Sequence, residues 1–122
     1  MAATTLNPPL GWHLVSEGNG TYSRETVTIA SGEGVLKAGA VLGKITASGK
    51  YAWYDNAASD GTQAAAAVLF GEVDATSADV KAVVHVRHAE VFADRLVYIT
   101  DADSTAVTAG KADLLALGIV AR

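Results

Sequence analysis

The sequence predicts a mainly β domain with one short helix, built as a small barrel or sandwich and preceded by an extended N-terminal arm. Three observations lead to this prediction. Short apolar segments with a period of two recur along residues 25–122, separated by Gly-containing turns. One segment near the C-terminus has helical spacing and ends at a glycine. Residues 1–24 contain both prolines and keep neither period.

We divide the chain into an arm at residues 1–24 and a β-rich domain at residues 25–122. The arm is mostly polar, but Leu6, Leu10, Trp12 and Leu14 recur at spacings of four or two. An indole ring serves little purpose in a linker, whereas it contributes much to a docked segment. We therefore expect the arm to dock on a partner. The alternative is that it packs on its own domain.

The individual elements follow from alternation and turn residues. In residues 25–30, Val27 and Ile29 alternate with threonines, as in a half-buried strand. Gly39 is expected to turn the chain into the next strand, and Gly118 to end the helix. We expect strands at residues 25–30, 41–46, 50–54, 68–73, 79–91, 95–100 and 119–122, and a helix at residues 108–118.

Composition narrows the classes of function. The 122 residues are enough for one domain with its own core. The net charge of -4 and an 18% content of charged residues argue against a nucleic-acid partner, which selects a basic surface. The absence of cysteine excludes disulfides and thiolate metal sites. No signal peptide and no apolar run long enough to span a bilayer is expected, so we predict no membrane partner.

No motif predicts catalysis, a metal or a cofactor. His85 and His88 are three residues apart, which places them on opposite faces of a strand. Asp101 and Asp103 lie in a sequence that lacks the later Gly and Glu of a calcium loop, so a solvated turn is expected. Neither a nucleophile elbow nor a phosphate-binding loop occurs. We expect a protein that is not an enzyme.

A second interpretation comes from the segment LKAGAVLGKI, residues 36–45. Biotinyl and lipoyl domains contain a similar turn before a barrel strand, so a carrier or small-ligand-binding β module is the alternative function. Their modified lysine usually lies beside a methionine in an exposed hairpin, whereas the only methionine here is Met1. A third interpretation, a secreted binding module, uses the sequon at Asn19. Without a secretory signal we interpret that sequon as a turn.

Three segments together resemble the head decoration protein D family of tailed bacteriophages, the lambda type. The segments are YSRETVTIASGEGVLKAGAVLGKITASGKY, ASDGTQAAAAVLFGEVDAT and LLALGIVAR, and the resemblance extends from Tyr22 to Arg122. It implies a non-enzymatic protein, made in the cytoplasm of the host bacterium and located on the outer capsid surface of the virion. It further implies a homotrimer at local three-fold sites of the expanded head, bound to the major capsid protein and stabilising the shell against packaged DNA.

The resemblance also implies that the arm orders on the capsid. Together with the apolar spacing of the arm, this gives a set of candidate capsid-contact residues at the end of the arm and the start of the domain. These residues are Leu10, Trp12, Leu14, Tyr22, Ser23, Arg24 and Glu25.

Overall fold

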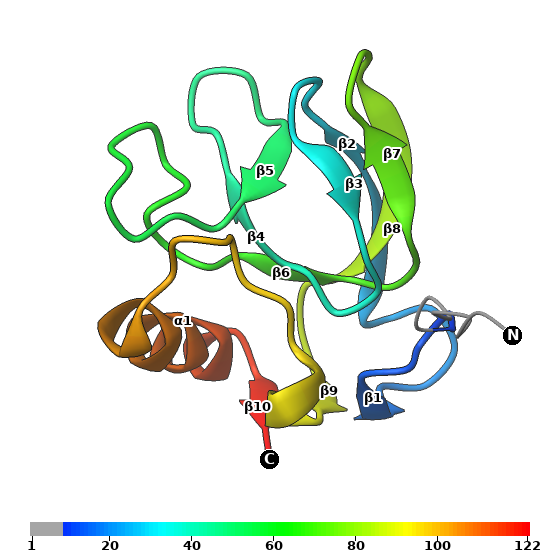
Figure 1. The fold of residues 1–122 in the computed structure, drawn as a ribbon. Helices are drawn as coiled ribbons and strands as arrows, with labels where there is room; N and C mark the ends of the chain where they lie inside the picture. The colour runs from blue at the N-terminus through cyan, green and yellow to red at the C-terminus, as the bar shows by residue number, and fades with distance from the viewer. Residues whose placement is uncertain (1–8) are drawn as a thin grey trace, which may run out of the picture.

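The computed structural model describes residues 9–122 and shows a closed five-stranded barrel with one helix packed against its outside (Figure 1). This architecture confirms the predicted mainly β fold with a single helix. Among residues 9–122, the helix falls short of the length and apolar character needed to cross a bilayer. Around the barrel the strands are β2 (Arg24–Ile29), β5 (Tyr51–Trp53), β4 (Val41–Lys44), β6 (Ala67–Leu69) and β8 (Val80–His85).

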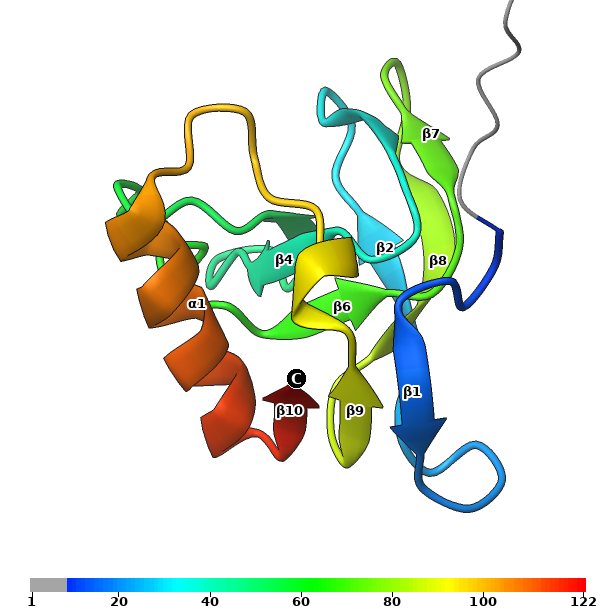
Figure 2. The ribbon, with the colours of Figure 1, turned by 60° about the horizontal axis from the view of Figure 1, so that its bottom comes forward.

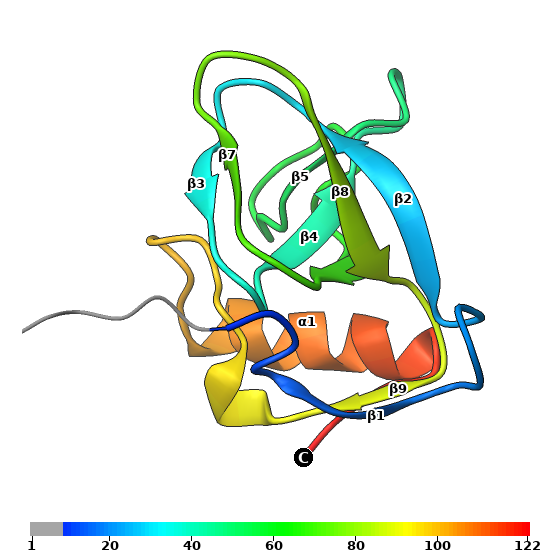
Figure 3. The ribbon, with the colours of Figure 1, turned by 90° about the vertical axis from the view of Figure 1, so that its right-hand side faces the viewer.

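Two smaller sheets complete the β structure. Strand β9 (Ala89–Val91) lies between β1 (Leu14–Glu17), which is antiparallel to it, and β10 (Ile119–Ala121), which is parallel (Figure 2). Strands β3 (Gly34–Leu36) and β7 (Val73–Ala75) form an antiparallel ribbon that extends the barrel (Figure 3). The helix, α1 (Ser104–Ala116), runs beside β10, so the three-stranded sheet and α1 together cover one side of the barrel.

Two apolar cores share the barrel wall. Leu42 and Leu69 point into the barrel, where they belong to the core that also contains Ile29 and Val84. Their neighbour Val41 points outward into a second core beneath α1 and the three-stranded sheet. Because β4 and β6 are buried on both faces, their apolar residues run continuously instead of alternating.

Two of the predicted strands are each divided in two. Residues 79–91 form β8 and β9, which belong to different sheets, and the chain turns between them at His88 with φ 49°. Residues 68–73 contribute to β6 and β7, with a break around Gly71. Continuous β propensity therefore does not reveal where a strand leaves one sheet for another.

Two other predicted elements need correction. Residues 95–100 were expected to form a strand, but they follow a 3-10 turn (Ala93–Arg95) and only Val97 makes an isolated bridge, to Ala40. The helix starts at Ser104 instead of residue 108, because the Asp103 carboxylate accepts a hydrogen bond from Ala106 N at 2.9 Å and caps it. Its end is as predicted, since Gly118 has φ 85° and follows the last turn.

The N-terminal segment differs from the expected arm over residues 1–24. Residues 1–8 lie outside the described residues. From Gly11 onward the chain is bonded to the domain: Gly11 N donates to Phe70 O at 3.0 Å, β1 pairs with β9, and His13 is fully buried. Residues 9–24 therefore lie against the domain, and the division of the chain at residue 24 stays a prediction.

Candidate functional site

The structure separates the seven candidate contact residues into an inner and an outer group. The inner group is buried or half-buried and holds the segment on the barrel, whereas the outer group is exposed. Leu14, Ser23 and Arg24 form the inner group. Leu10, Trp12, Tyr22 and Glu25 form the outer group, of which Leu10 is 66%, Tyr22 58% and Trp12 41% exposed.

Ser23 is a structural residue whose side chain is buried. Its hydroxyl accepts a hydrogen bond from Gly18 N at 2.8 Å and donates one to His88 O at 2.8 Å. These bonds tie the turn after β1 to the turn before β9. Leu14 packs against the second core beneath α1. Both side chains thus have a role in the fold, and the expectation that they contact a capsid stays a prediction.

Arg24 joins a half-buried ionic cluster between β1 and the barrel. Its guanidinium donates from Nε and Nη2 to the Glu17 carboxylate, at 2.9 and 2.6 Å, and lies 4.3 Å from the Phe70 ring centre. Glu17 Oε1 also lies 3.0 Å from His85 Nε2. The two partners lower the pKa of Glu17 to about 2, with the Arg24 hydrogen bonds as the main cause.

His13 was placed in the arm by the sequence, yet it is one of the most buried side chains. Its ring meets that of His85 edge to face, with 6.2 Å between the ring centres. Burial, and secondarily the nearby His85, lower the pKa of His13 to about 4. Burial likewise lowers the pKa of His85, although Glu17 acts in the opposite direction. Both rings are therefore neutral at pH 7.

The two aromatic residues of the outer group are stacked on arginines. Trp12 lies under the Arg95 guanidinium, 4.0 Å from the ring centre, and Arg95 Nη1 also donates to Trp12 O at 2.9 Å. Tyr22 faces Arg87 in the same way at 5.5 Å. The stacking fixes both rings while leaving part of each surface open. Such preordered aromatic side chains are typical of binding surfaces.

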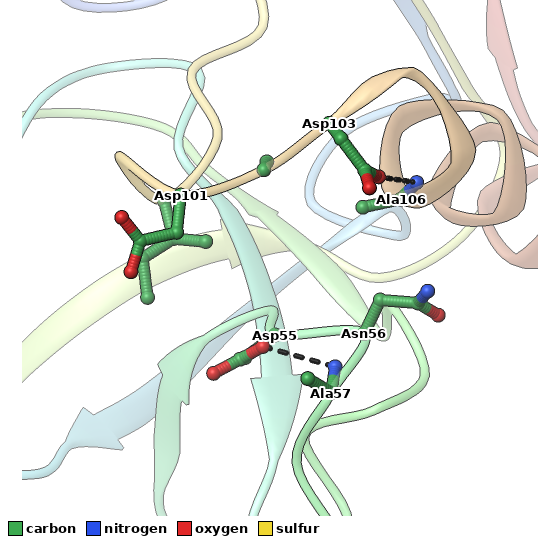
Figure 4. Close-up of a pocket in the computed structure, with 8 residues that line it drawn as sticks. Asp55, Asn56, Ala57, Asp101, Asp103 and Ala106 are labelled. Carbon is green, nitrogen blue, oxygen red and sulfur yellow. Dashed lines mark hydrogen bonds between the residues drawn. The ribbon is translucent and has the colours of Figure 1, made fainter.

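Three aspartates line a hollow near the start of α1 (Figure 4). Asp55 accepts a hydrogen bond from Ala57 N at 3.0 Å, Asp103 caps the helix, and Asp101 lies beside them. The first two carboxylates thus have structural roles in a turn and a cap. Within residues 9–122, no group of three or more His or acidic side chains is placed to hold a metal ion.

Together these features define a small β-barrel protein that presents ordered aromatic side chains at its surface. The family model of bacteriophage lambda head decoration protein D matches residues 3–119, nearly the whole chain. The protein therefore belongs to the head decoration protein D family. A comparison with curated proteins gave no match. Membership confirms the resemblance seen in the sequence, supports a capsid decoration role with association to the phage capsid, and favours this interpretation over the carrier module.

Proposed function

We propose that this protein binds the outer surface of the expanded phage head as a homotrimer at local three-fold positions and stabilises the shell against packaged DNA. Its partner is the major capsid protein, and it is made in the host cytoplasm before attachment. The observation that carries the proposal is the family match over residues 3–119. A structural role in the virion requires no catalytic centre, in keeping with the prediction that the protein is not an enzyme.

The attachment surface is proposed to follow the N-terminal segment. Leu10 and Trp12 are exposed shortly before β1, and Tyr22 is exposed in the turn between β1 and β2. Strand β1 is also the edge strand of its sheet. An edge strand can pair with an added strand through main-chain hydrogen bonds, and flanking apolar side chains then add specificity.

Anchoring of this segment matters for the affinity. Ordering a free backbone costs about 1–2 kcal/mol per residue, and residues 9–24 are already ordered on the domain. Three copies that bind together convert weak single contacts into avidity. A small surface around Trp12 can therefore hold a trimer on the shell.

The test is co-sedimentation with expanded, undecorated heads. We expect the full chain to bind, and a Leu10→Ala/Trp12→Ala variant to bind at least tenfold more weakly. A chain lacking residues 1–8 measures the contribution of the first residues while keeping the described fold. If the full chain fails to bind heads of its own phage, the proposed function is wrong. Stabilisation is read from the temperature at which filled heads release DNA, with and without the protein.

A further inference from the structure

Two surfaces of opposite charge lie on neighbouring parts of the domain, since Thr46 N of the β4–β5 turn donates to Asp60 O at 2.9 Å. The first, here called the basic groove, lies between β2, β8 and the β4–β5 turn and contains Lys44, Lys50 and Lys81. The second, here called the acidic corner, consists of the loops at residues 54–63 and 98–103 at the start of α1. They share no lining residue. In Figures 1 and 3, β2 and β8 lie away from α1 across the barrel.

The basic groove lies where the pairing between the barrel strands β2 and β5 is short. Strand β2 pairs with β8 at six positions but with β5 only at Ile29 and Tyr51. Beyond that pair the two strands diverge and leave a groove of about 340 Å³. Thr26 and Thr28 of β2 are among its lining residues, and the groove is mainly polar.

The lysines of the groove are only partly neutralised. Lys50 forms an ion pair with Asp79 at 2.7 Å. In the described part of the chain, neither Lys44 nor Lys81 takes part in an ion pair. The acidic residue at the end of the groove, Glu25, is already paired with Arg87. The groove therefore has an excess of positive charge on a chain whose net charge is -4.

The acidic corner has the opposite excess. Its two loops contain Asp55, Asp60, Asp101 and Asp103 and no lysine or arginine. Three of these carboxylates accept backbone hydrogen bonds that shape the loops. None of the four takes part in an ion pair of residues 9–122. Asp101 is exposed.

We propose that the acidic corner of one copy docks in the basic groove of the next and so forms the subunit contact of a closed three-membered ring. This inference rests on the trimer of the proposed function and names its contact surfaces. A contact between two different surfaces of identical chains is heterologous, and it closes into a ring when the rotation allows it. Opposite charges fix the register of such a contact and disfavour groove against groove or corner against corner.

The charge pattern also accounts for when the ring forms. Exposed ion pairs are weak individually and are screened by salt. Copies held side by side on a shell have a high effective concentration, which favours closure of the ring there. Free copies are expected to associate only at high concentration and low salt.

The test uses a cysteine pair, because the chain contains no cysteine of its own. Ser48→Cys places a thiol at the rim of the groove and Thr100→Cys one at the corner, both at exposed positions. A short thiol crosslinker is applied to decorated heads and, separately, to the concentrated free chain at low salt. We expect a covalent trimer from the double variant and mainly monomer from either single variant.

The second test is charge reversal. Lys44→Glu/Lys81→Glu and, separately, Asp101→Lys are each expected to reduce the trimer yield at least fivefold, and the triple variant to recover it. Lys111→Glu and Asp94→Lys, at exposed sites outside both surfaces, should leave the yield unchanged. Monomer alone in both settings, or reversal variants that crosslink like the parent, would overturn the inference. Failure of the parent to bind heads would instead overturn the proposed function. Crosslinking of the free chain would still show whether the ring forms.

Discussion

Glu17 Oε1 lies 3.0 Å from Nε2 of His85, which links β1 to the barrel strand β8 across 68 residues of sequence. The same carboxylate receives the two hydrogen bonds of Arg24. His13 fills the space beside His85 with a ring that is also inaccessible to solvent. One acid and two neutral imidazoles thus hold the N-terminal segment on the barrel.

Acidification is expected to weaken this attachment. Between pH 6.5 and about 4 the unfolded chain binds a proton at His13 that the folded protein does not, since burial lowers the pKa of the ring. Stability therefore falls as the pH drops through this window, by about 1–3 kcal/mol for His13. Protonation of Glu17 adds a further loss between pH 4.5 and about 2. Urea unfolding at a series of pH values measures the free energy of unfolding directly.

Variants at the histidines separate this effect from general acid denaturation. His13→Leu removes a titrating ring whose nitrogens have no hydrogen-bond partner among the described residues, so the loss between pH 6.5 and 4 should shrink. His88→Asn changes an exposed histidine and should keep the full pH dependence. An unchanged pH profile in His13→Leu would contradict the assignment.

Arg24→Met tests the ionic part of the cluster. Methionine keeps the apolar packing against Phe70 but leaves Glu17 with one partner fewer in a half-buried position. We expect a loss of about 1–3 kcal/mol in the free energy of unfolding at pH 7. The pKa of the Glu17 carboxyl, followed by NMR, should rise. In Arg24→Met/Glu17→Gln the orphaned charge is gone, so part of the stability should return.

Strand β2 could be predicted from the sequence because one of its faces lies in the core and its apolar residues have a period of two. In β2, Val27 and Ile29 face the core as predicted. The sequence placed His85 and His88 on opposite faces of a strand, and His85 lies on the face of β8 that contacts His13 and Glu17. What covers that face could not be predicted, since the contacts of His13 and Glu17 depend on a pairing of distant segments. The sequence pattern within one segment contains no information about such pairings.

The candidate contact residues differ in how far their surroundings could be predicted from the sequence. Trp12 and Tyr22 were expected to contact the capsid; the structure shows both side chains exposed, and the contact itself stays a prediction. Ser23 belonged to a segment typical of the family, but its role depends on His88 O, 65 residues away. Resemblance to a family does not separate residues that bind from residues that fold.

The effect of Gly110→Ala on the free energy of unfolding depends on how the added methyl group packs. In an isolated helix this change stabilises by up to about 1 kcal/mol. Here a Cβ at Gly110 would come 2.8 Å from Cε2 of Tyr54, whose hydroxyl is fixed by a bond to Ala106 O at 2.9 Å. We expect a net loss of about 1–3 kcal/mol in thermal or urea unfolding. The matched change Ala112→Gly, on the exposed face of α1, should cost only the propensity of about 1 kcal/mol.

Trp12→Ala separates attachment from folding. The indole is 41% exposed and its main inward contact is the stack with Arg95, so its loss should lower the free energy of unfolding by no more than about 1 kcal/mol. Binding to expanded heads should weaken about tenfold or more, because a buried aromatic anchor contributes at least about 1.4 kcal/mol to an interface. Leu115→Ala, which removes an exposed apolar side chain from α1, is the control and should bind like the parent. Circular dichroism measures folding and co-sedimentation measures binding on the same samples. If Trp12→Ala unfolds, the residue is part of the core. If the variant binds as well as the parent, the attachment surface lies elsewhere.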